Sequence, residues 1–187
     1  MILHITQRDK DTAQTLFFLR VGKECEMEQG RITVFCGEGK GKTSAALGQA
    51  IFGASKGRSV IIIQFLKGKA GEGIDFIKRL EPEIKVFSFE KSDANFQELS
   101  PEEQEEECMN IRNGMNFARK VLSTDGCDIL ILDEVLGLLD KGIVTSEELK
   151  ALIETKDEET DLMFTGIHMC EELYPYADDV FQIGTLK

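Results

Sequence analysis

The sequence has few of the residues that mark metal centres, disulfide scaffolds or nucleophilic catalysis. Its five cysteines are scattered, without a Cys-x-x-Cys pair, and its two histidines, His4 and His168, lie far apart. This spacing argues against a zinc site and a disulfide framework, and it suits reduced thiols in a cytosol. No Ser-His or Cys-His constellation is evident either.

Positive charge and long apolar runs are also scarce. The chain has 22 Lys and Arg against 34 Asp and Glu, which gives it a net charge of −12. So acidic a chain repels a nucleic-acid backbone unless its basic residues cluster, and the sequence has no basic run. No apolar run approaches the ~20 residues of a membrane span, and residues 1–11 lack a signal-peptide pattern. We therefore expect a cytoplasmic protein without nucleic-acid or membrane partners.

From Arg31 onward, short apolar runs alternate with helical patterns in this 187-residue chain. This alternation predicts an α/β fold, a mainly parallel sheet with helices on both faces. The predicted strands are Ile32–Cys36, Val60–Phe65, Lys85–Phe89, Asp128–Leu132, Leu162–Thr165 and Val180–Ile183. We expect one domain over residues 30–187, preceded by an arm, residues 1–29, for which a hairpin, a helix or packing on a second subunit remain open.

Two helices are marked by their first residues. Ser100-Pro101-Glu102-Glu103 is a capping box with proline at the first helical position, and it predicts a helix to about Ser123. Thr145-Ser146-Glu147-Glu148 repeats the pattern before a shorter helix. The acidic run over residues 102–107 complements the dipole of the first helix, so we interpret it as structural.

A glycine-rich segment follows the first predicted strand. It reads Gly37-Glu38-Gly39-Lys40-Gly41-Lys42-Thr43-Ser44 and leads into an apolar helix. Backbone N–H groups of such a loop and the helix N-terminus bind phosphates, Lys42 adds a mobile positive charge, and the Thr43 hydroxyl is a magnesium ligand. The loop misses the consensus GxxxxGK[ST] by one residue, because Cys36 stands where the first glycine belongs. We predict a P-loop for ATP and Mg²⁺, formed by residues 37–44.

The second element of this site is an apolar strand that ends in two carboxylates, Asp133 and Glu134. Ligands of open parallel sheets bind at the carboxyl ends of the strands. We therefore expect Asp133 and Glu134 to emerge beside the P-loop, with one of them holding magnesium through water.

These motifs together resemble the ATP:cob(I)alamin (corrinoid) adenosyltransferases of the BtuR/CobO type. The resemblance rests on the loop CGEGKGKTSAALGQA, on IIIQFLKGK at Ile61–Lys69, on ILILDE at Ile129–Glu134 and on FTG at Phe164–Gly166. It covers roughly residues 30–187, and the strand end Gln64-Phe65-Leu66-Lys67-Gly68 is absent from generic P-loop ATPases. It implies a P-loop NTPase-like (RecA-like) fold.

The resemblance implies adenosyl transfer, in which a Co(I) corrinoid attacks the 5′ carbon of ATP and triphosphate leaves. Lys42 and magnesium then stabilise the leaving group, and no protein nucleophile is required. The family also has an aromatic residue in a loop after the third strand. Here that stretch is Ser92-Asp93-Ala94-Asn95-Phe96, and Phe96 either contacts the corrinoid or packs in the core. A reductase and a second copy of the chain are candidate partners.

Two arginines of the family pattern are replaced here, by Phe52 in the helix after the P-loop and by Ile167 after Thr165-Gly166. Both arginines are expected to be donors near the nucleotide, and His168 is a candidate substitute or a surface histidine. The replacements leave two alternatives open: a non-catalytic regulator that binds ATP or corrinoid, and a generic P-loop ATPase or kinase.

Overall fold

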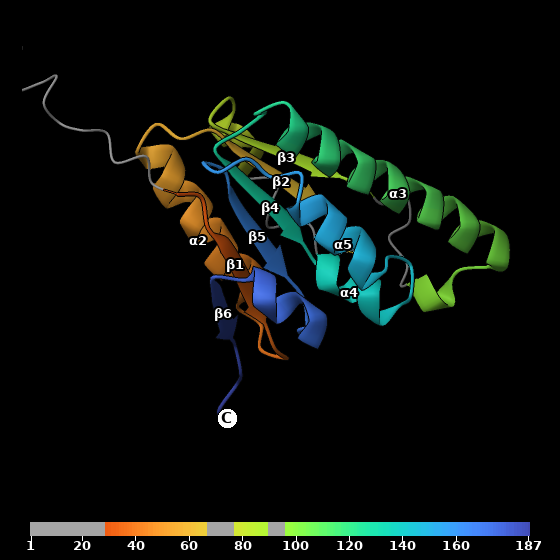
Figure 1. The fold of residues 1–187 in the computed structure, drawn as a ribbon. Coiled ribbons are helices and arrows are strands. Elements are labelled where there is room, and N and C mark those ends of the chain that lie inside the picture. Colours follow the sequence, from red (N-terminus) through yellow and green to blue (C-terminus); the bar gives the residue numbers. More distant parts are fainter. Residues whose placement is uncertain (1–28, 67–76, 90–95) are drawn as a thin grey trace, which may run out of the picture.

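The computed structural model describes residues 29–66, 77–89 and 96–187, and Figure 1 shows its layers. The predicted arm therefore lies outside the described residues except for Gln29, as do Ser92–Asn95 and Lys67-Gly68. The strands are β1 (Ile32–Cys36), β2 (Val60–Gln64), β3 (Ile84–Ser88), β4 (Ile129–Asp133), β5 (Asp161–Thr165) and β6 (Asp179–Gln182). The helices are α2 (Lys42–Ser55), α3 (Pro101–Ser123), α4 (Val135–Asp140) and α5 (Ser146–Ile153), with short 3₁₀ helices η2 (Ile77–Leu80), η3 (Phe96–Glu98) and η4 (Glu171–Tyr176).

The six strands form one sheet in the order β3-β2-β4-β5-β1-β6, and every pair is parallel. The strand β5 lies between β1, which precedes the glycine-rich loop, and β4, which ends in Asp133. This is the P-loop NTPase-like (RecA-like) α/β arrangement, and the predicted fold class is confirmed. All six predicted strands are present, with bounds that differ by a residue or so.

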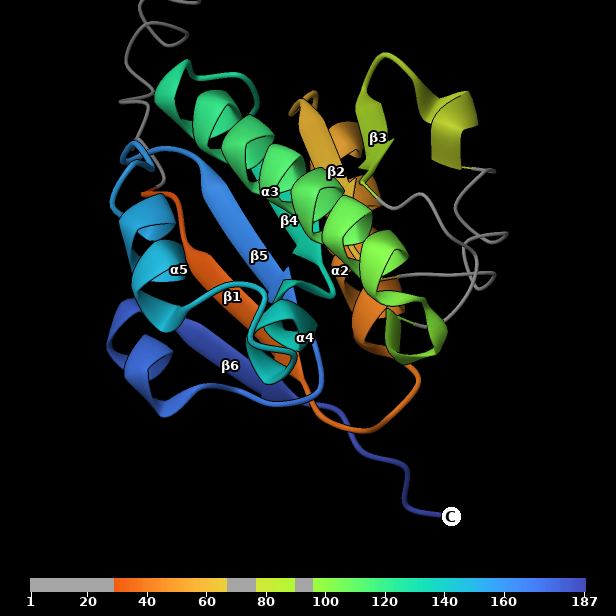
Figure 2. The ribbon, with the colours of Figure 1, turned by 90° about the vertical axis from the view of Figure 1, so that its right-hand side faces the viewer.

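Helices cover both faces of the sheet, so the interior strands are buried on both sides. In Figures 1 and 2, α2 lies on one face, and α3, α4 and α5 lie on the other. Every residue of β2 and β4 is buried, whereas the edge strands β3 and β6 are partly exposed. The larger apolar core lies under α3, α4 and α5, and a smaller one lies under α2.

Both predicted capping boxes are formed. In α3, the Ser100 hydroxyl accepts the Glu103 N–H and the Glu103 carboxylate accepts the Ser100 N–H; Thr145 and Glu148 exchange the same bonds in α5. Each box satisfies N–H groups that a helix start leaves without partners. Within the described residues, no helix is both long and apolar enough to cross a bilayer.

Candidate active site

The glycine-rich loop joins β1 to α2 and packs closely against the chain that follows β6. Gly37 has φ +111°, and a Cβ there would collide with the Ile183 carbonyl; a Cβ on Gly39 would lie 2.9 Å from the same oxygen. The Gly37 N–H donates to the Ile167 carbonyl at 2.8 Å and the Gly39 N–H to the Ile183 carbonyl at 3.0 Å. This differs from the expectation that the loop glycines present their N–H groups to phosphate, because these two N–H groups are used within the protein.

Lys42, the first residue of α2, folds back over this loop. Its Nζ donates to the Gly37 carbonyl at 2.8 Å and to the Gly39 carbonyl at 3.1 Å, and the residue is only 9% exposed. Glu38 and Lys40, in contrast, are exposed. A buried ammonium is thus held at the loop by neutral carbonyl dipoles, which a phosphate can replace.

The N-terminus of α2 carries no side-chain cap and no acidic residue in its first turn. The N–H groups at a helix start lack intrahelical partners, and the helix dipole makes this end positive. In α2 the N–H groups of Lys42, Thr43 and Ser44 come first, ahead of the Ala45 N–H, which donates to the Gly41 carbonyl. This end therefore has the geometry and charge that suit an anion.

Asp133 lies beside this helix start, as expected from the sequence. It ends β4, is 1% exposed, and its Oδ1 accepts the Thr43 hydroxyl at 2.9 Å. The strand β4 and the P-loop are separated by β5 in the sheet, so the hydroxyl and the carboxylate meet across the top of that strand.

Two residues that sequence reasoning did not assign to the site also contact Asp133. The Thr165 hydroxyl donates to Asp133 Oδ1 at 2.6 Å, and Gln64 Nε2 donates to Asp133 Oδ2 at 3.2 Å. Both belong to motifs that carry the family resemblance, Gln64-Phe65 and Phe164-Thr165. Their place in these motifs could have marked them as site residues, but the motifs do not indicate that both contact Asp133.

Glu134 follows Asp133 and turns the chain into α4. Its φ is +63°, an uncommon value outside glycine, and its N–H donates to the Thr165 hydroxyl at 2.8 Å. Its carboxylate lies 3.7 Å from where a Cβ on Gly137 would sit. The Glu134 side chain thus extends over the first turn of α4, while Asp133 is turned toward Thr43.

The donor set at this edge fits magnesium. Mg²⁺ prefers oxygen ligands and is usually held by one or two carboxylates together with substrate phosphates. Thr43 and Asp133 supply a hydroxyl and a carboxylate 2.9 Å apart, directly at the helix end that suits phosphate. Within the described ranges, no group of three His, Cys, Asp or Glu side chains could hold a metal alone.

Cys36, in the position of the missing consensus glycine, is buried at the end of β1. Burial raises the pKa of its thiol, although Lys42 and a backbone hydrogen bond oppose this. The thiolate is the nucleophilic form, so Cys36 is a neutral packing residue and no nucleophile is added to the site.

Phe96 begins η3, directly before α3. Its ring is half-buried against the larger apolar core, and Lys141 Nζ lies 5.9 Å from the ring centroid. Phe96 therefore packs against the core, as one of the two alternatives predicted, although it is only half-buried. The preceding residues of the predicted corrinoid loop lie outside the described residues, and a corrinoid contact by Phe96 stays a prediction.

The two replaced arginines lie in different places. Phe52 is 63% exposed in the last turn of α2, about 15 Å along the helix axis from Lys42. The Ile167 carbonyl, in contrast, accepts the Gly37 N–H. Position 167 therefore lies at the P-loop, whereas position 52 is remote from it, and the expectation that both lie near the nucleotide stays a prediction.

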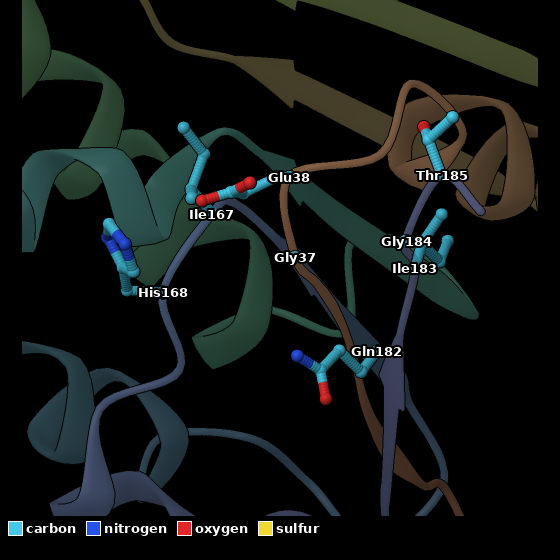
Figure 3. Close-up of a pocket in the computed structure, with 8 residues that line it drawn as sticks. All are labelled: Gly37, Glu38, Ile167, His168, Gln182, Ile183, Gly184 and Thr185. Carbon is cyan, nitrogen blue, oxygen red and sulfur yellow. The ribbon is translucent and has the colours of Figure 1, made fainter. Parts of the chain in front are cut away.

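A pocket of about 420 Å³ opens beside the loop (Figure 3). Its lining comes from the P-loop, the segment after β5 and the segment after β6: Gly37, Glu38, Ile167, His168, Gln182, Ile183, Gly184 and Thr185. His168 is exposed, and its Nδ1 lies 3.0 Å from the Asp140 carboxylate. It is therefore engaged with α4 at the pocket wall.

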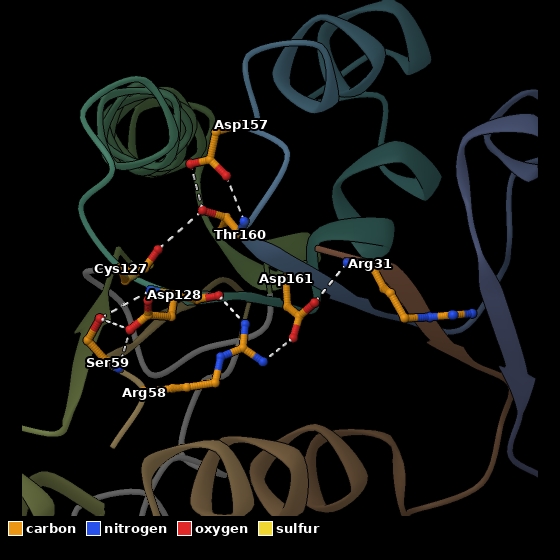
Figure 4. A network of polar contacts seen from close by, with 8 residues as sticks. All are labelled: Arg31, Arg58, Ser59, Cys127, Asp128, Asp157, Thr160 and Asp161. Atoms are coloured by element: carbon orange, nitrogen blue, oxygen red, sulfur yellow. Dashed lines mark hydrogen bonds and ion pairs between the residues drawn. The ribbon is translucent and has the colours of Figure 1, made fainter. Parts of the chain in front are cut away.

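A second polar cluster lies at the opposite, amino edge of the sheet (Figure 4). Arg58 donates to the Asp161 carboxylate at 2.6 Å and to the Asp128 carbonyl at 2.9 Å. The Asp128 carboxylate accepts both the N–H and the hydroxyl of Ser59, which lowers the Asp128 pKa. These contacts join the starts of β2, β4 and β5.

Comparison with known proteins gives a consistent result. The family model described as ATP:corrinoid adenosyltransferase BtuR/CobO/CobP matches residues 28–187. The chain is 26% identical over 164 residues to the "Corrinoid adenosyltransferase" of Escherichia coli (strain K12), covering 88% of this chain and 81% of that protein. Identity and coverage are the same for "Corrinoid adenosyltransferase CobA" of Salmonella typhimurium (strain LT2). The Pseudomonas aeruginosa "Corrinoid adenosyltransferase" is 24% identical over 161 residues, 86% of this chain and 77% of that protein.

Proposed function

Because the chain belongs to the ATP:corrinoid adenosyltransferase family BtuR/CobO/CobP, we propose that it transfers the 5′-deoxyadenosyl group of ATP to the Co(I) centre of a corrinoid. The observation that carries this proposal is the convergence of Lys42, Thr43 and Asp133 at the start of α2. It provides a cation, a hydroxyl and a carboxylate where a triphosphate and its magnesium would be held.

The proposed step is a displacement at the 5′ carbon of ATP. The cobalt–carbon bond forms with the electron pair of Co(I), the bond from that carbon to the triphosphate oxygen breaks, and its electron pair leaves with the triphosphate. Cobalt becomes formally Co(III). Charge accumulates on the leaving group, so the protein assists by stabilising that anion.

Lys42 is the principal group for this task. Its ammonium is held within hydrogen-bonding distance of the Gly37 and Gly39 carbonyls, so little reorganisation is needed when a phosphate oxygen takes their place. The helix start of α2 adds N–H donors that point along its axis, and the exposed Glu38 and Lys40 and the half-buried Gly41 border them. Among the predicted phosphate-binding residues, Gly37 and Gly39 instead shape the loop.

Magnesium would be held by Thr43 and Asp133, with Glu134 as a further candidate ligand through water. When bound, the ion supplies positive charge to the triphosphate. Phe96 is the proposed corrinoid contact. A reductase is a candidate source of Co(I), a second copy of the chain is a candidate partner, and a cytoplasmic location is part of the proposal.

The test is anaerobic mixing of the full chain with ATP, Mg²⁺ and chemically reduced cobalamin. We expect the visible spectrum of Co(I) to be replaced by that of an alkylcobalamin that photolyses in light. A reaction without ATP is the control. A Co(I) spectrum that persists equally with and without ATP would contradict the activity.

One observation favours a second candidate, a regulator that binds ATP or corrinoid without turnover. Position 167, where the family pattern has arginine, lies at the P-loop and holds an isoleucine that is 42% exposed. The loss of that charge would weaken catalysis more than binding. Saturable ATP binding by calorimetry, together with no spectral change of the corrinoid, would favour the regulator.

A further inference from the structure

Gln64 and Thr165 are buried polar residues of the family motifs to which the proposed function gives no role. Gln64 ends β2 and Thr165 ends β5, the strands on either side of β4. Both side chains are buried, with exposed fractions of 3% and 0%. Their hydrogen bonds converge on the carboxylate of Asp133 from opposite sides.

Each oxygen of Asp133 has its own donors. Oδ1 accepts the hydroxyls of Thr43 at 2.9 Å and Thr165 at 2.6 Å, and Oδ2 accepts Gln64 Nε2 at 3.2 Å. A buried carboxylate is costly without such donors. Donors on both oxygens also restrict rotation of the carboxylate, so that Oδ1 stays turned toward the first residues of α2.

The two flanking residues are themselves oriented by neighbours. The Thr165 hydroxyl accepts the Glu134 N–H at 2.8 Å, which directs its own hydrogen toward Asp133. The Ser88 hydroxyl donates to Gln64 Oε1 at 3.4 Å, which leaves Nε2 on the Asp133 side. The arrangement spans β3, β2, β4 and β5.

We propose that Thr165 and Gln64 are positioning residues that hold Asp133 in the orientation required for the nucleotide-bound divalent cation. This proposal rests on the proposed function, because the cation is that of the ATP substrate. Residues that support metal ligands from outside typically contribute 10–100-fold to metal affinity. We expect effects of that order when the hydroxyl of Thr165 or the amide of Gln64 is removed.

The chain offers a matched control at the other end of the same strand. Thr160 directly precedes β5, is also buried, and donates its hydroxyl to Asp157 Oδ2 at 2.8 Å. Replacing either threonine by valine removes a buried hydroxyl next to an aspartate. A structural role would give both replacements the same consequence, whereas a positioning role affects cation binding at Thr165 alone.

The experiment uses Mn²⁺ as a spectroscopic substitute for Mg²⁺. Electron paramagnetic resonance measures the binding of Mn²⁺ to the full chain at saturating ATP. We expect Thr165→Val to weaken Mn²⁺ binding about tenfold, with Thr165→Ser restoring it and Thr160→Val leaving it unchanged. Circular dichroism and melting temperature establish that each variant is folded. Equal Mn²⁺ affinity in folded Thr165→Val and wild type would overturn the positioning role.

Gln64 provides an independent arm if Thr165→Val does not fold. Gln64→Met keeps the length of the side chain without the amide. We expect Mn²⁺ affinity to fall in this variant, and unchanged affinity would contradict the proposal. Wild-type protein that binds no Mn²⁺ with ATP would overturn the proposed cation site itself, and the positioning role with it.

Discussion

The two edges of the sheet both contain buried or half-buried charged groups, but they satisfy them differently. At the amino edge, Arg58 pairs with Asp161, and the Asp128 carboxylate accepts two bonds from Ser59. At the carboxyl edge, Lys42 donates to two carbonyls and Asp133 accepts from hydroxyl and amide groups. The amino edge thus includes an ion pair between Arg58 and Asp161, whereas Lys42 at the carboxyl edge is held by neutral carbonyls.

This difference separates a structural cluster from a site built for a charged ligand. An ion pair within the protein has little to gain from an added phosphate or cation. A lysine held by carbonyls keeps its full charge for an incoming anion, and it is already desolvated and oriented.

Among substitutions that test this difference between the edges, we expect the largest loss of activity at Lys42. Lys42→Ala removes the preorganised charge from the leaving triphosphate, and we expect the adenosylation rate to fall on the order of 10²–10³-fold with the fold intact. Lys56→Ala, exposed at the opposite end of α2, is the matched control. Initial rates with reduced cobalamin measure both. Normal kinetics in a well-folded Lys42→Ala protein would remove the P-loop from the mechanism.

Asp133→Asn should have the next largest effect. The amide keeps the size of the side chain but loses the negative charge, so we expect the Mg²⁺ concentration for half-maximal rate to rise on the order of tenfold or more. The apparent affinity for corrinoid should change far less. Magnesium titration at saturating ATP is the measurement, and an unchanged midpoint would refute the metal role of Asp133.

Arg58→Met tests the opposite edge. It removes the donors to Asp161 and to the Asp128 carbonyl, and hydrogen bonds to charged groups are worth about 1.5–3 kcal/mol. We expect the free energy of unfolding in urea to fall by about that amount, with unchanged kcat and magnesium dependence in the folded protein. A changed magnesium midpoint would show that the two edges are not separate.

Restoring the family arginines should change ATP affinity by a smaller amount, and only at one of the two positions. An arginine at the partly exposed position 167 would form a solvent-screened pair with phosphate worth about 0–1 kcal/mol, so we expect at most about fivefold tighter ATP binding in Ile167→Arg. Phe52→Arg should leave ATP affinity unchanged because of its distance from Lys42. Calorimetric titration compares the two. A larger gain at position 52 would contradict the placement of the nucleotide.

The smallest effect is expected in acid at the amino edge. Hydrogen bonds from the Ser59 hydroxyl and N–H lower the pKa of Asp128. Because the folded pKa lies below the unfolded one, this contribution to stability is present above about pH 4 and is lost as pH falls through the folded pKa. Ser59→Ala should flatten the decline of unfolding free energy below pH 4. An acid profile identical to that of wild type would exclude this contribution.

The sequence predicted what local patterns determine. All six strands and both capping boxes follow from apolar runs and from Ser100 and Thr145, which lie within a few residues of the groups they bind. The short helix α4 was not predicted, because it begins after Glu134, whose positive φ is stabilised by Thr165 from another strand. The contact of the loop glycines with Ile183 is likewise long-range.

The candidate site was predicted in its P-loop and in Asp133, because both lie at ends of recognisable strands. Gln64 and Thr165 belong to recognisable motifs, yet their contact with a shared partner depends on the order of the strands in the sheet. Local sequence patterns do not predict that order. The remoteness of Phe52 was available from the rise of an α-helix alone, ten residues beyond Lys42. The expectation that this position lies near the nucleotide stays a prediction.

The central claim is that this chain uses the carboxyl edge to release triphosphate rather than to transfer a phosphoryl group. Phosphorus NMR of the full chain with ATP and Mg²⁺, with and without reduced cobalamin, tests it directly. The account predicts intact tripolyphosphate that accumulates only when reduced cobalamin is present. Orthophosphate and ADP that accumulate without any corrinoid would contradict it and identify an ATPase instead.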